Sequence, residues 1–361
     1  MSLPIIPSPQ VWSALAGAGL VTGEPPAHRG QPPWFVRVLL GFGGWMGALF
    51  LIGFVGVGFV FIMDSAPAAL LAGALVCAGA GVAFAAAEDR DSPFLASFAF
   101  AFSLAGQGLM AWGFAGLLEP NIGVCAAALA LQQAVLFVAM RSALHRVWTA
   151  ASCAFALLVM LADWKLASLA VPLLSAPLAW IWLRELEAAR WAASWRAAGY
   201  GIAASTVLAA CSEPGFTLFA LLGGPASDTF VQATRWTGLA LGAAVLVGAT
   251  LALLRRERVA PGSPAGRSAL LITAILALAS LKAPGITPAL LLLVLGFANG
   301  NRLLAGAGIA ALVGYLSHFY YSLHATLLDK SALLAATGAT LLLARLVLGR
   351  NWPRAAEASD A

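Results

Sequence analysis

The chain has 361 residues, of which 61% are hydrophobic and 10% charged, and its formal net charge is +5. Soluble domains carry about 25% charged residues, so this composition excludes a water-soluble globular fold. Apolar runs of about twenty residues recur along the sequence, long enough to cross a bilayer core of roughly 30 Å. Because the hydrophobicity is continuous and does not alternate, it predicts an all-α, polytopic transmembrane helical bundle and not a transmembrane β-barrel.

The basic residues stand singly or in short clusters at the ends of the apolar runs. This placement is typical of anchoring against anionic lipid heads, so the expected partner is the lipid bilayer and not a nucleic acid. The sequence contains no P-loop, no GxGxxG after a strand, no HExxH and no GxSxG. We therefore expect no catalytic residue, no cofactor and no metal ion, and we interpret His28 and His145 as lone loop histidines.

The N-terminal residues 1–33 are proline-rich and mildly polar, and they predict a short cytoplasmic arm. Within the arm, residues 11–21 fit a small amphipathic helix that ends at the break over residues 23–26. This helix either packs under the bundle as a surface helix or binds lipid or a partner. Residues 34–350 form a single predicted transmembrane domain, and residues 351–361 a disordered cytoplasmic tail.

Eight apolar runs of span length follow the arm, joined mostly by short connections that favour antiparallel neighbours. They cover residues 38–62, 67–87, 94–118, 122–140, 147–162, 166–183, a run that starts near residue 197, and 236–254. The run from residue 197 either ends at Cys211, with the segment from Phe216 dipping into the interface, or is a helix broken inside the bilayer with Glu213 at depth. The longer connection over residues 184–196 carries Trp191 and Trp195, which predicts an interfacial helix with aromatic anchors. Gly43 and Gly47 form a small-xxx-small pair in the first span; packing inside the chain is the first interpretation and dimerisation the second.

Two shorter apolar runs, residues 268–281 and 286–298, follow a hydrophilic linker that contains Arg255, Arg256 and Arg258. Each corresponds to roughly 21 Å of helix, which is short for a full crossing. They are either two tilted or buried spans or a re-entrant helical hairpin. Two further helices close the chain, so we expect about 12 helices, or about 10 crossings plus a re-entrant hairpin.

The basic residues divide unevenly when the compartments are numbered alternately from the N-terminal arm. One side keeps Lys165, Arg235, Lys282 and Lys330. The other side collects Arg29, Arg37, Arg90, Arg141, Arg146, Arg184, Arg190, Arg196, Arg255, Arg256, Arg258, Arg267, Arg302, Arg345, Arg350 and Arg354. The positive-inside rule makes the arginine-rich side cytoplasmic. The prediction is thus a multi-pass membrane protein with both termini in the cytoplasm.

The closing stretch, residues 296–348, is the densest run of polar chemistry in the sequence. Its non-cytoplasmic end, together with an acidic residue at a proline–glycine break, could line a polar pocket. The candidate pocket residues are Glu213, Tyr315, His318, Tyr320, Tyr321, His324, Asp329 and Lys330. The alternative is an aromatic belt at headgroup level with helix-cap chemistry, and an interfacial position for Glu213.

Three glutamines, Gln107, Gln132 and Gln133, fall inside predicted spans. They either hydrogen-bond between helices, each bond contributing about 0.6–2 kcal/mol, or line a polar path. Asn299 and Asn301 flank a glycine between two apolar runs, and this pattern predicts cap and turn roles for both.

Two segments of the chain resemble a known family. One is FANGNRLLAGAGIAALVGYLSHFYYSLHATLLDKSALLAATGATLLLAR, residues 297–345, and the other is PPWFVRVLLGFGGWMGALFLIGFVG, residues 32–56. They are similar to the C-terminal half and the first span of the bacterial membrane proteins grouped as domain of unknown function 4401, related to domain of unknown function 2157. The resemblance transfers no catalytic residue, because that family has no established activity. It implies a small membrane partner named for a GDYxxLxY motif.

Together with this resemblance, the sequence indicates an uncharacterised integral protein of the bacterial cytoplasmic (inner) membrane. The first hypothesis is a structural or complex-forming component that acts beside the small GDYxxLxY-type partner. The second is a transporter or lipid-handling channel with a polar site near the periplasmic side. The third, an intramembrane enzyme, requires Glu213 to meet His318 or His324.

Overall fold

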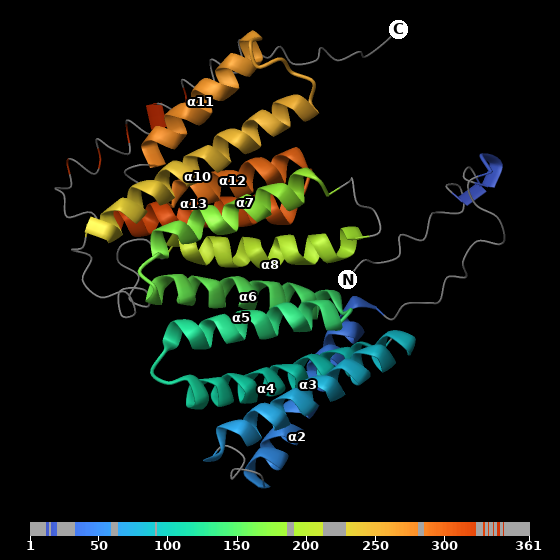
Figure 1. The fold of residues 1–361 in the computed structure, drawn as a ribbon. Helices are drawn as coiled ribbons and strands as arrows, with labels where there is room; N and C mark the ends of the chain where they lie inside the picture. Colours follow the sequence, from blue (N-terminus) through green and yellow to red (C-terminus); the bar gives the residue numbers. More distant parts are fainter. Residues whose placement is uncertain are drawn as a thin grey trace. The chain divides into compact units, whose positions relative to one another are not determined.

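A computed structural model describes residues 33–58, 64–90, 92–185, 191–211, 229–280 and 285–322, with short stretches nearer the two ends. Within these residues the chain forms 11 α-helices, one short 3-10 helix and no strand (Figure 1). The all-α prediction is confirmed for this part of the chain. The predicted arm helix, the closing run over residues 331–348 and the tail lie outside the continuous described ranges.

The chain packs as two compact units. The first contains residues 1–120 and 135–146, and the second contains residues 121–134 and 147–361. Helices α5 (Ile122–Ala139) and α6 (Ala143–Asp163) contribute residues to both units. Each unit has buried clusters of its own.

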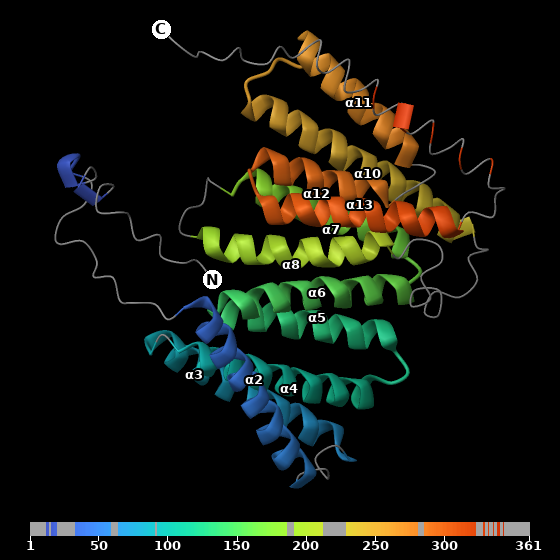
Figure 2. The same cartoon turned by 180° about the vertical axis from the view of Figure 1, so that it is seen from behind.

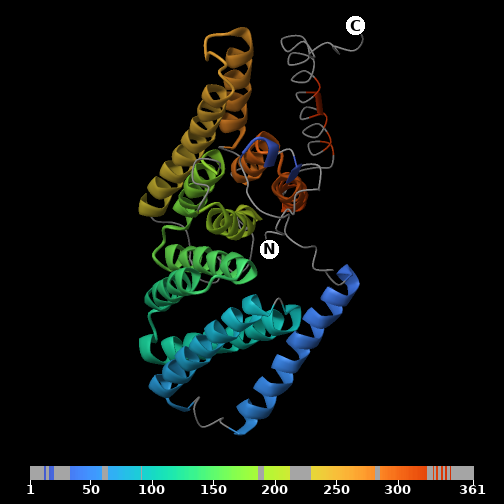
Figure 3. The ribbon, with the colours of Figure 1, turned by 90° about the vertical axis from the view of Figure 1, so that its right-hand side faces the viewer.

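The first unit is built on α2 (Trp34–Gly58), α3 (Ala66–Asp89) and α4 (Pro93–Leu118). Helices α3 and α4 lie side by side (Figure 3). Their backbones approach closely, because a Cβ on Gly106 would lie 2.8 Å from the Gly73 carbonyl oxygen. Small residues at such contacts let helices pack where lipid supplies no hydrophobic drive. The buried apolar cluster of this unit consists of Cys77, Ala80, Phe84, Ala99, Leu136 and Met140.

The glycines of α2 pack against another helix of the same chain. A Cβ on Gly43 or Gly47 would lie 3.9 or 3.8 Å from the ring of Phe94, and Gly44 lies directly against the Phe94 carbonyl group. Two residues before Phe94, Ser92 caps the start of α4, because its hydroxyl accepts a hydrogen bond from Leu95 N at 3.3 Å. The small-xxx-small pair therefore packs against α4 of the same unit, as the first interpretation expects.

The second unit holds the remaining helices. They are η2 (Ala167–Leu169), α7 (Ala170–Leu183), α8 (Ala192–Cys211), α10 (Thr229–Arg256), α11 (Pro264–Ser280), α12 (Ile286–Ala298) and α13 (Arg302–Ser322). Helix α12 packs against α7, α8, α10 and α13, and Figures 1 and 2 show α12 and α13 side by side. Leu291, Leu292 and Leu295 of α12 are all 0% exposed. The short run over residues 286–298 is thus a buried helix of the second unit.

Two predicted helix boundaries are wrong. Helix α6 begins at Ala143 and not near residue 147, so His145 lies in its first turn and not in a loop. Helix α8 begins at Ala192, so Trp195 belongs to α8 and not to a separate interfacial helix; its ring lies 4.8 Å from that of Trp180 in α7. The polar His145 and the aromatic Trp195 look like residues of connecting segments in the sequence. In the structure each belongs to a helix and contacts a side chain of another helix.

Within the part of the chain that the structure describes, five helices are long and apolar enough to cross a membrane. They are Ala66–Asp89, Pro93–Leu118, Ile122–Ala139, Ala143–Asp163 and Ala233–Arg256. Large apolar side chains on such helices point outward; Leu75 is 73% exposed and Val138 is 76% exposed. Outward apolar surface of this extent suits lipid better than water, which supports a membrane-embedded helical protein.

Candidate functional site

The polar pocket predicted near the end of the chain falls largely outside the described side chains. Tyr315 lies in α13 and is only 3% exposed. His318, Tyr320 and Tyr321 belong to the same helix by their backbone, and their side chains lie outside the described set. Glu213, His324, Asp329 and Lys330 lie outside the described residues altogether. The pocket stays a prediction.

A cluster of buried polar side chains lies in the first unit, where α4 meets the start of α6. Ser103 Oγ is 2.9 Å from His145 Nε2, and it accepts a hydrogen bond from Gln107 Nε2 at 3.1 Å. The distance from Gln107 Nε2 to His145 Nε2 is 3.4 Å. Ser103 and His145 are 0% exposed and Gln107 is 6% exposed. We call this group the Ser103–Gln107–His145 cluster.

Arg146 stabilises the turn between α5 and α6, and this turn positions His145 in the cluster. Its Nε donates to the carbonyl oxygens of Met140, at 2.9 Å, and Phe137, at 3.3 Å. The last carbonyl groups of a helix have no partner within the helix, and a cationic side chain there satisfies them. The chain therefore turns after Ala139, and His145 in the first turn of α6 reaches Ser103 on α4.

Aromatic rings enclose the cluster. The rings of Phe84 in α3 and Phe100 in α4 meet the imidazole of His145 edge to face, at centroid distances of 5.4 and 6.4 Å. A serine beside a histidine is also the arrangement of a nucleophile and its base, but that chemistry needs room for a reacting atom about 3 Å away. Because Ser103 and His145 are fully covered, the cluster acts as a polar link between α4 and α6.

The sequence contains a signal for this cluster that the hydropathy pattern does not show. Ser103 and Gln107 stand four residues apart in an otherwise apolar run, which places both on one face of a helix. A polar pair on a buried face requires a polar partner from another helix. His145, near the start of α6, is a polar residue that could be predicted as that partner.

The other two predicted intramembrane glutamines lie in α5, in the second unit. Gln132 is 7% exposed and Gln133 is 6% exposed. The amide nitrogen and oxygen of Gln132 have no hydrogen-bond partner among the described residues. The three glutamines thus differ, because Gln107 alone belongs to the cluster with His145.

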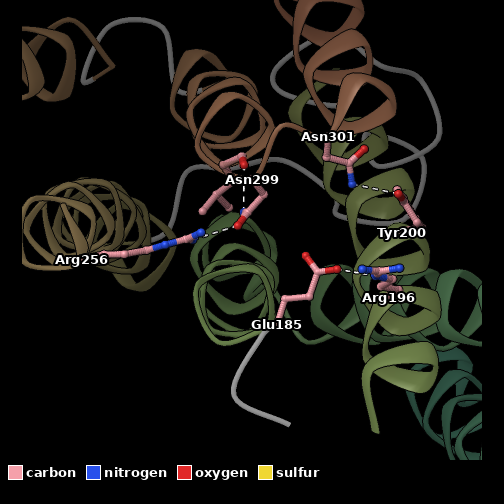
Figure 4. Close-up of polar contacts among 7 residues, drawn as sticks. Glu185, Arg196, Tyr200, Arg256, Asn299 and Asn301 are labelled. Atoms are coloured by element: carbon pink, nitrogen blue, oxygen red, sulfur yellow. Dashed lines mark hydrogen bonds and ion pairs between the residues drawn. The ribbon is translucent and has the colours of Figure 1, made fainter. Parts of the chain in front are cut away.

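A second set of polar contacts surrounds the turn between α12 and α13 (Figure 4). Asn301 caps α13, because its Oδ1 accepts a hydrogen bond from Leu304 N at 3.1 Å. Asn299 Nδ2 donates to the carbonyl oxygen of Leu295 in α12 at 3.0 Å. Gly300 between them has φ +60°, a conformation that glycine adopts without strain. The predicted cap and turn roles are confirmed for both asparagines.

The same asparagines connect the turn to other helices of the second unit. Asn301 Nδ2 donates to the hydroxyl of Tyr200 in α8 at 2.8 Å. Arg256 at the end of α10 donates from Nη1 to Asn299 Oδ1 at 2.9 Å. Figure 4 also shows the ion pair between Glu185, just after α7, and Arg196 in α8. The α12–α13 turn is therefore the point at which α8, α10, α12 and α13 are joined by side chains.

A match over most of the chain shows the family to which it belongs. A family model described as Domain of unknown function (DUF4401) matches residues 33–351. The chain belongs to the DUF4401 family. The match covers α2 to α13, so the Ser103–Gln107–His145 cluster and the α12–α13 turn both lie inside the DUF4401 domain. Comparison with the curated proteins and with the solved structures found no match.

Proposed function

We propose that this DUF4401 protein is a multi-pass protein of the bacterial cytoplasmic membrane, with both termini in the cytoplasm. The five long apolar helices support a membrane location. The proposed orientation rests on the division of arginine between the two sides of the bundle. Arg90 at the end of α3, Arg256 at the end of α10 and Arg302 at the start of α13 all stand at helix ends, where that division expects them.

We further propose that the protein is a structural or complex-forming membrane component. The observation that carries this proposal is that its best-defined buried polar groups join helices to one another. Ser103 and His145 connect α4 to α6, and Asn301 and Tyr200 connect α13 to α8. Polar groups in apolar surroundings are commonly placed for such links, which make one helix arrangement specific.

The proposed partner is the small membrane protein with a GDYxxLxY motif that the family resemblance implies. To test this, the full chain is produced in a bacterial membrane with and without that protein and purified in mild detergent. Complex mass is measured by native mass spectrometry and Tm by intrinsic fluorescence. We expect co-elution at a fixed ratio and a Tm that rises with partner concentration, because a ligand that binds only the folded state stabilises it.

Two controls make the experiment decisive. An unrelated single-span protein should neither co-elute nor raise Tm. A panel of small solutes should leave Tm unchanged for a structural component. If the GDYxxLxY protein has no effect and one solute raises Tm in a saturable manner, the complex-forming role is wrong and the transporter or lipid-handling alternative takes its place.

A further inference from the structure

A small pocket opens in the second unit where the start of α12 meets α10 and η2. It holds about 20 Å³, and its lining includes Arg235, Ser168, Gly242 and Thr287. A water-sized site needs about 10–15 Å³, so the pocket has room for a single oxygen atom and little more. A larger ligand would place one oxygen inside and the rest of its atoms at the mouth.

The chemistry of the lining favours a negatively charged oxygen. Arg235 contributes a guanidinium, which forms no ion pair with an acidic residue in the described ranges. Thr287 is 4% exposed and contributes a hydroxyl-bearing side chain to the lining. Ser168 adds a second hydroxyl. A guanidinium and hydroxyl groups are hydrogen-bond donors suited to an oxyanion.

The helix that carries Thr287 adds to this preference. Helix α12 starts at Ile286 after the N-cap Gly285, and because Pro288 in its first turn has no N–H, Ile286 and Thr287 supply the first N–H groups of the helix. The first N–H groups of a helix and its dipole attract anions. The arginine, the buried threonine and the helix start thus act on the same small volume from two different helices.

The surroundings of the pocket indicate where such an anion comes from. Trp236, next to Arg235, is 61% exposed, and Trp164, which precedes η2, is 48% exposed. Exposed tryptophans at the ends of apolar helices are typical of the headgroup level of a membrane. Phosphate groups are the most abundant oxyanions at that level.

We propose that the pocket lined by Arg235, Ser168 and Thr287 binds a phosphate group, with one phosphate oxygen in the pocket and the others at the Arg235 guanidinium. A phospholipid headgroup and a free phosphate share this chemistry. The choice of a lipid as the source rests on the membrane location in the proposed function; it does not depend on the small partner protein.

The test uses the full chain in detergent with a photoreactive phosphatidylglycerol and with diacylglycerol of the same chains, which lacks phosphate. Crosslinked peptides are mapped by mass spectrometry, so that lipid at this pocket is separated from lipid elsewhere. We expect peptides that contain Ser168 or Arg235 to be labelled by phosphatidylglycerol about tenfold more than by diacylglycerol, because charge-assisted hydrogen bonds are worth about one decade or more in binding.

Four variants, one of them a control, test which residues bind the phosphate group. Arg235→Gln should lower the labelling of these peptides about tenfold, and Arg235→Lys should lower it less, since lysine keeps the charge without the planar fork. Gly242→Ala should also lower it, because the added Cβ enters the pocket lining while its nearest neighbour, Thr287 Cγ2, is 3.9 Å away, an ordinary contact that the fold tolerates. The matched control Arg267→Gln changes an exposed arginine in α11, outside the pocket, and should have no effect.

Inorganic phosphate added as a competitor distinguishes the two sources. Labelling that persists at millimolar phosphate supports a lipid phosphate, and labelling that is lost supports a free phosphate at the same site. Equal labelling by diacylglycerol, or labelling that neither Arg235→Gln nor Gly242→Ala reduces, would overturn the proposal. Either result is independent of the partner experiment, which measures co-elution with a protein.

Discussion

At the scale of single residues, buried polar side chains have the largest individual consequences in this protein. A buried polar group left without a partner costs about 1–3 kcal/mol, whereas a satisfied pair contributes less than that. Ser103 and His145 are both 0% exposed, so each depends on the other more than on solvent. Their contribution is best measured as a coupling and not as the loss from one substitution.

We therefore expect Ser103→Ala and His145→Phe to be non-additive. Phenylalanine keeps a ring in place of the imidazole and removes its nitrogens, so both changes delete the same 2.9 Å contact. The coupling between the two substitutions should be about 0.6–2 kcal/mol in the free energy of unfolding, the range found for hydrogen bonds between membrane helices. The measurement is denaturant unfolding of the detergent-solubilised protein, followed by tryptophan fluorescence.

The control for this cycle is Ser92, which caps α4 in the same unit. Ser92→Ala should lower stability by about 0.5–2 kcal/mol, because Leu95 N loses its acceptor. Its effect should add to that of His145→Phe, since distant sites without shared partners are additive. A zero coupling between Ser103→Ala and His145→Phe would show that the cluster does not link α4 to α6.

At the scale of helices, close backbone contact defines the α12–α13 pair. A Cβ on Gly308 of α13 would lie 2.6 Å from Leu293 N of α12, a distance that real side chains do not reach without movement. The backbone atoms it would meet cannot rotate away as a flexible side chain can. The glycine is therefore required at this position by the contact between the helices.

We expect opposite effects from two glycine substitutions in α13. Gly308→Ala should lower the free energy of unfolding by about 1–3 kcal/mol, because the helices must separate. Gly306→Ala should raise it by about 0.4–1 kcal/mol, because nothing lies within 4 Å of the added Cβ and alanine loses less backbone entropy on folding. Thermal unfolding in detergent measures both, and equal Tm values for the two variants would contradict the packing of α12 on α13.

At the scale of the whole molecule, the proposed orientation in the membrane rests on where the arginines stand along the chain. In that proposal the turn between α10 and α11 belongs to the arginine-rich side, and the turn before α7 belongs to the other. Gly262 and Ala167 are exposed positions in these two turns. A Cβ on Gly262 would meet nothing within 4 Å, so a cysteine is tolerated there.

We expect Gly262→Cys and Ala167→Cys to be labelled from opposite sides of the membrane, in a background from which the native cysteines have been removed. A membrane-impermeant maleimide should label Ala167→Cys in intact cells and Gly262→Cys only after permeabilisation. Labelling is read as a mass shift of the purified protein. If both positions react in intact cells, the alternating layout of the helices is wrong.

The helices themselves were largely predictable, and their ends less so. The apolar runs over residues 67–87 and 94–118 correspond closely to α3 and α4, because hydrophobicity over twenty residues is a local property. The start of α6 was misjudged, because Arg146 and His145 look like connection residues until Met140 and Ser103 are known to bind them. Whether a polar residue near a helix end belongs to the helix or to the connection can be predicted only when its hydrogen-bond partners are known.

In the candidate sites, too, local features are predictable from the sequence and long-range contacts are not. Asn301 was recognisable as a cap from its place before an apolar run, since capping acts within a few residues of sequence. Its bond to Tyr200 joins residues 101 positions apart, and nothing in the local pattern points to that pairing. The pocket at Arg235 likewise combines residues from η2, α10 and α12, which only the packing of these helices brings together.

By itself, the sequence determined that this DUF4401 protein is all-helical, apolar enough to embed in a membrane, and asymmetric in its arginines. Each of these properties depends on residues close together in the chain. The tertiary structure alone decided that His145 joins Ser103, that the α12–α13 turn joins α8 and α10, and that Arg235 shares a pocket with Thr287. Those pairings depend on how helices pack, and packing is selected by the fit of many distant side chains at once.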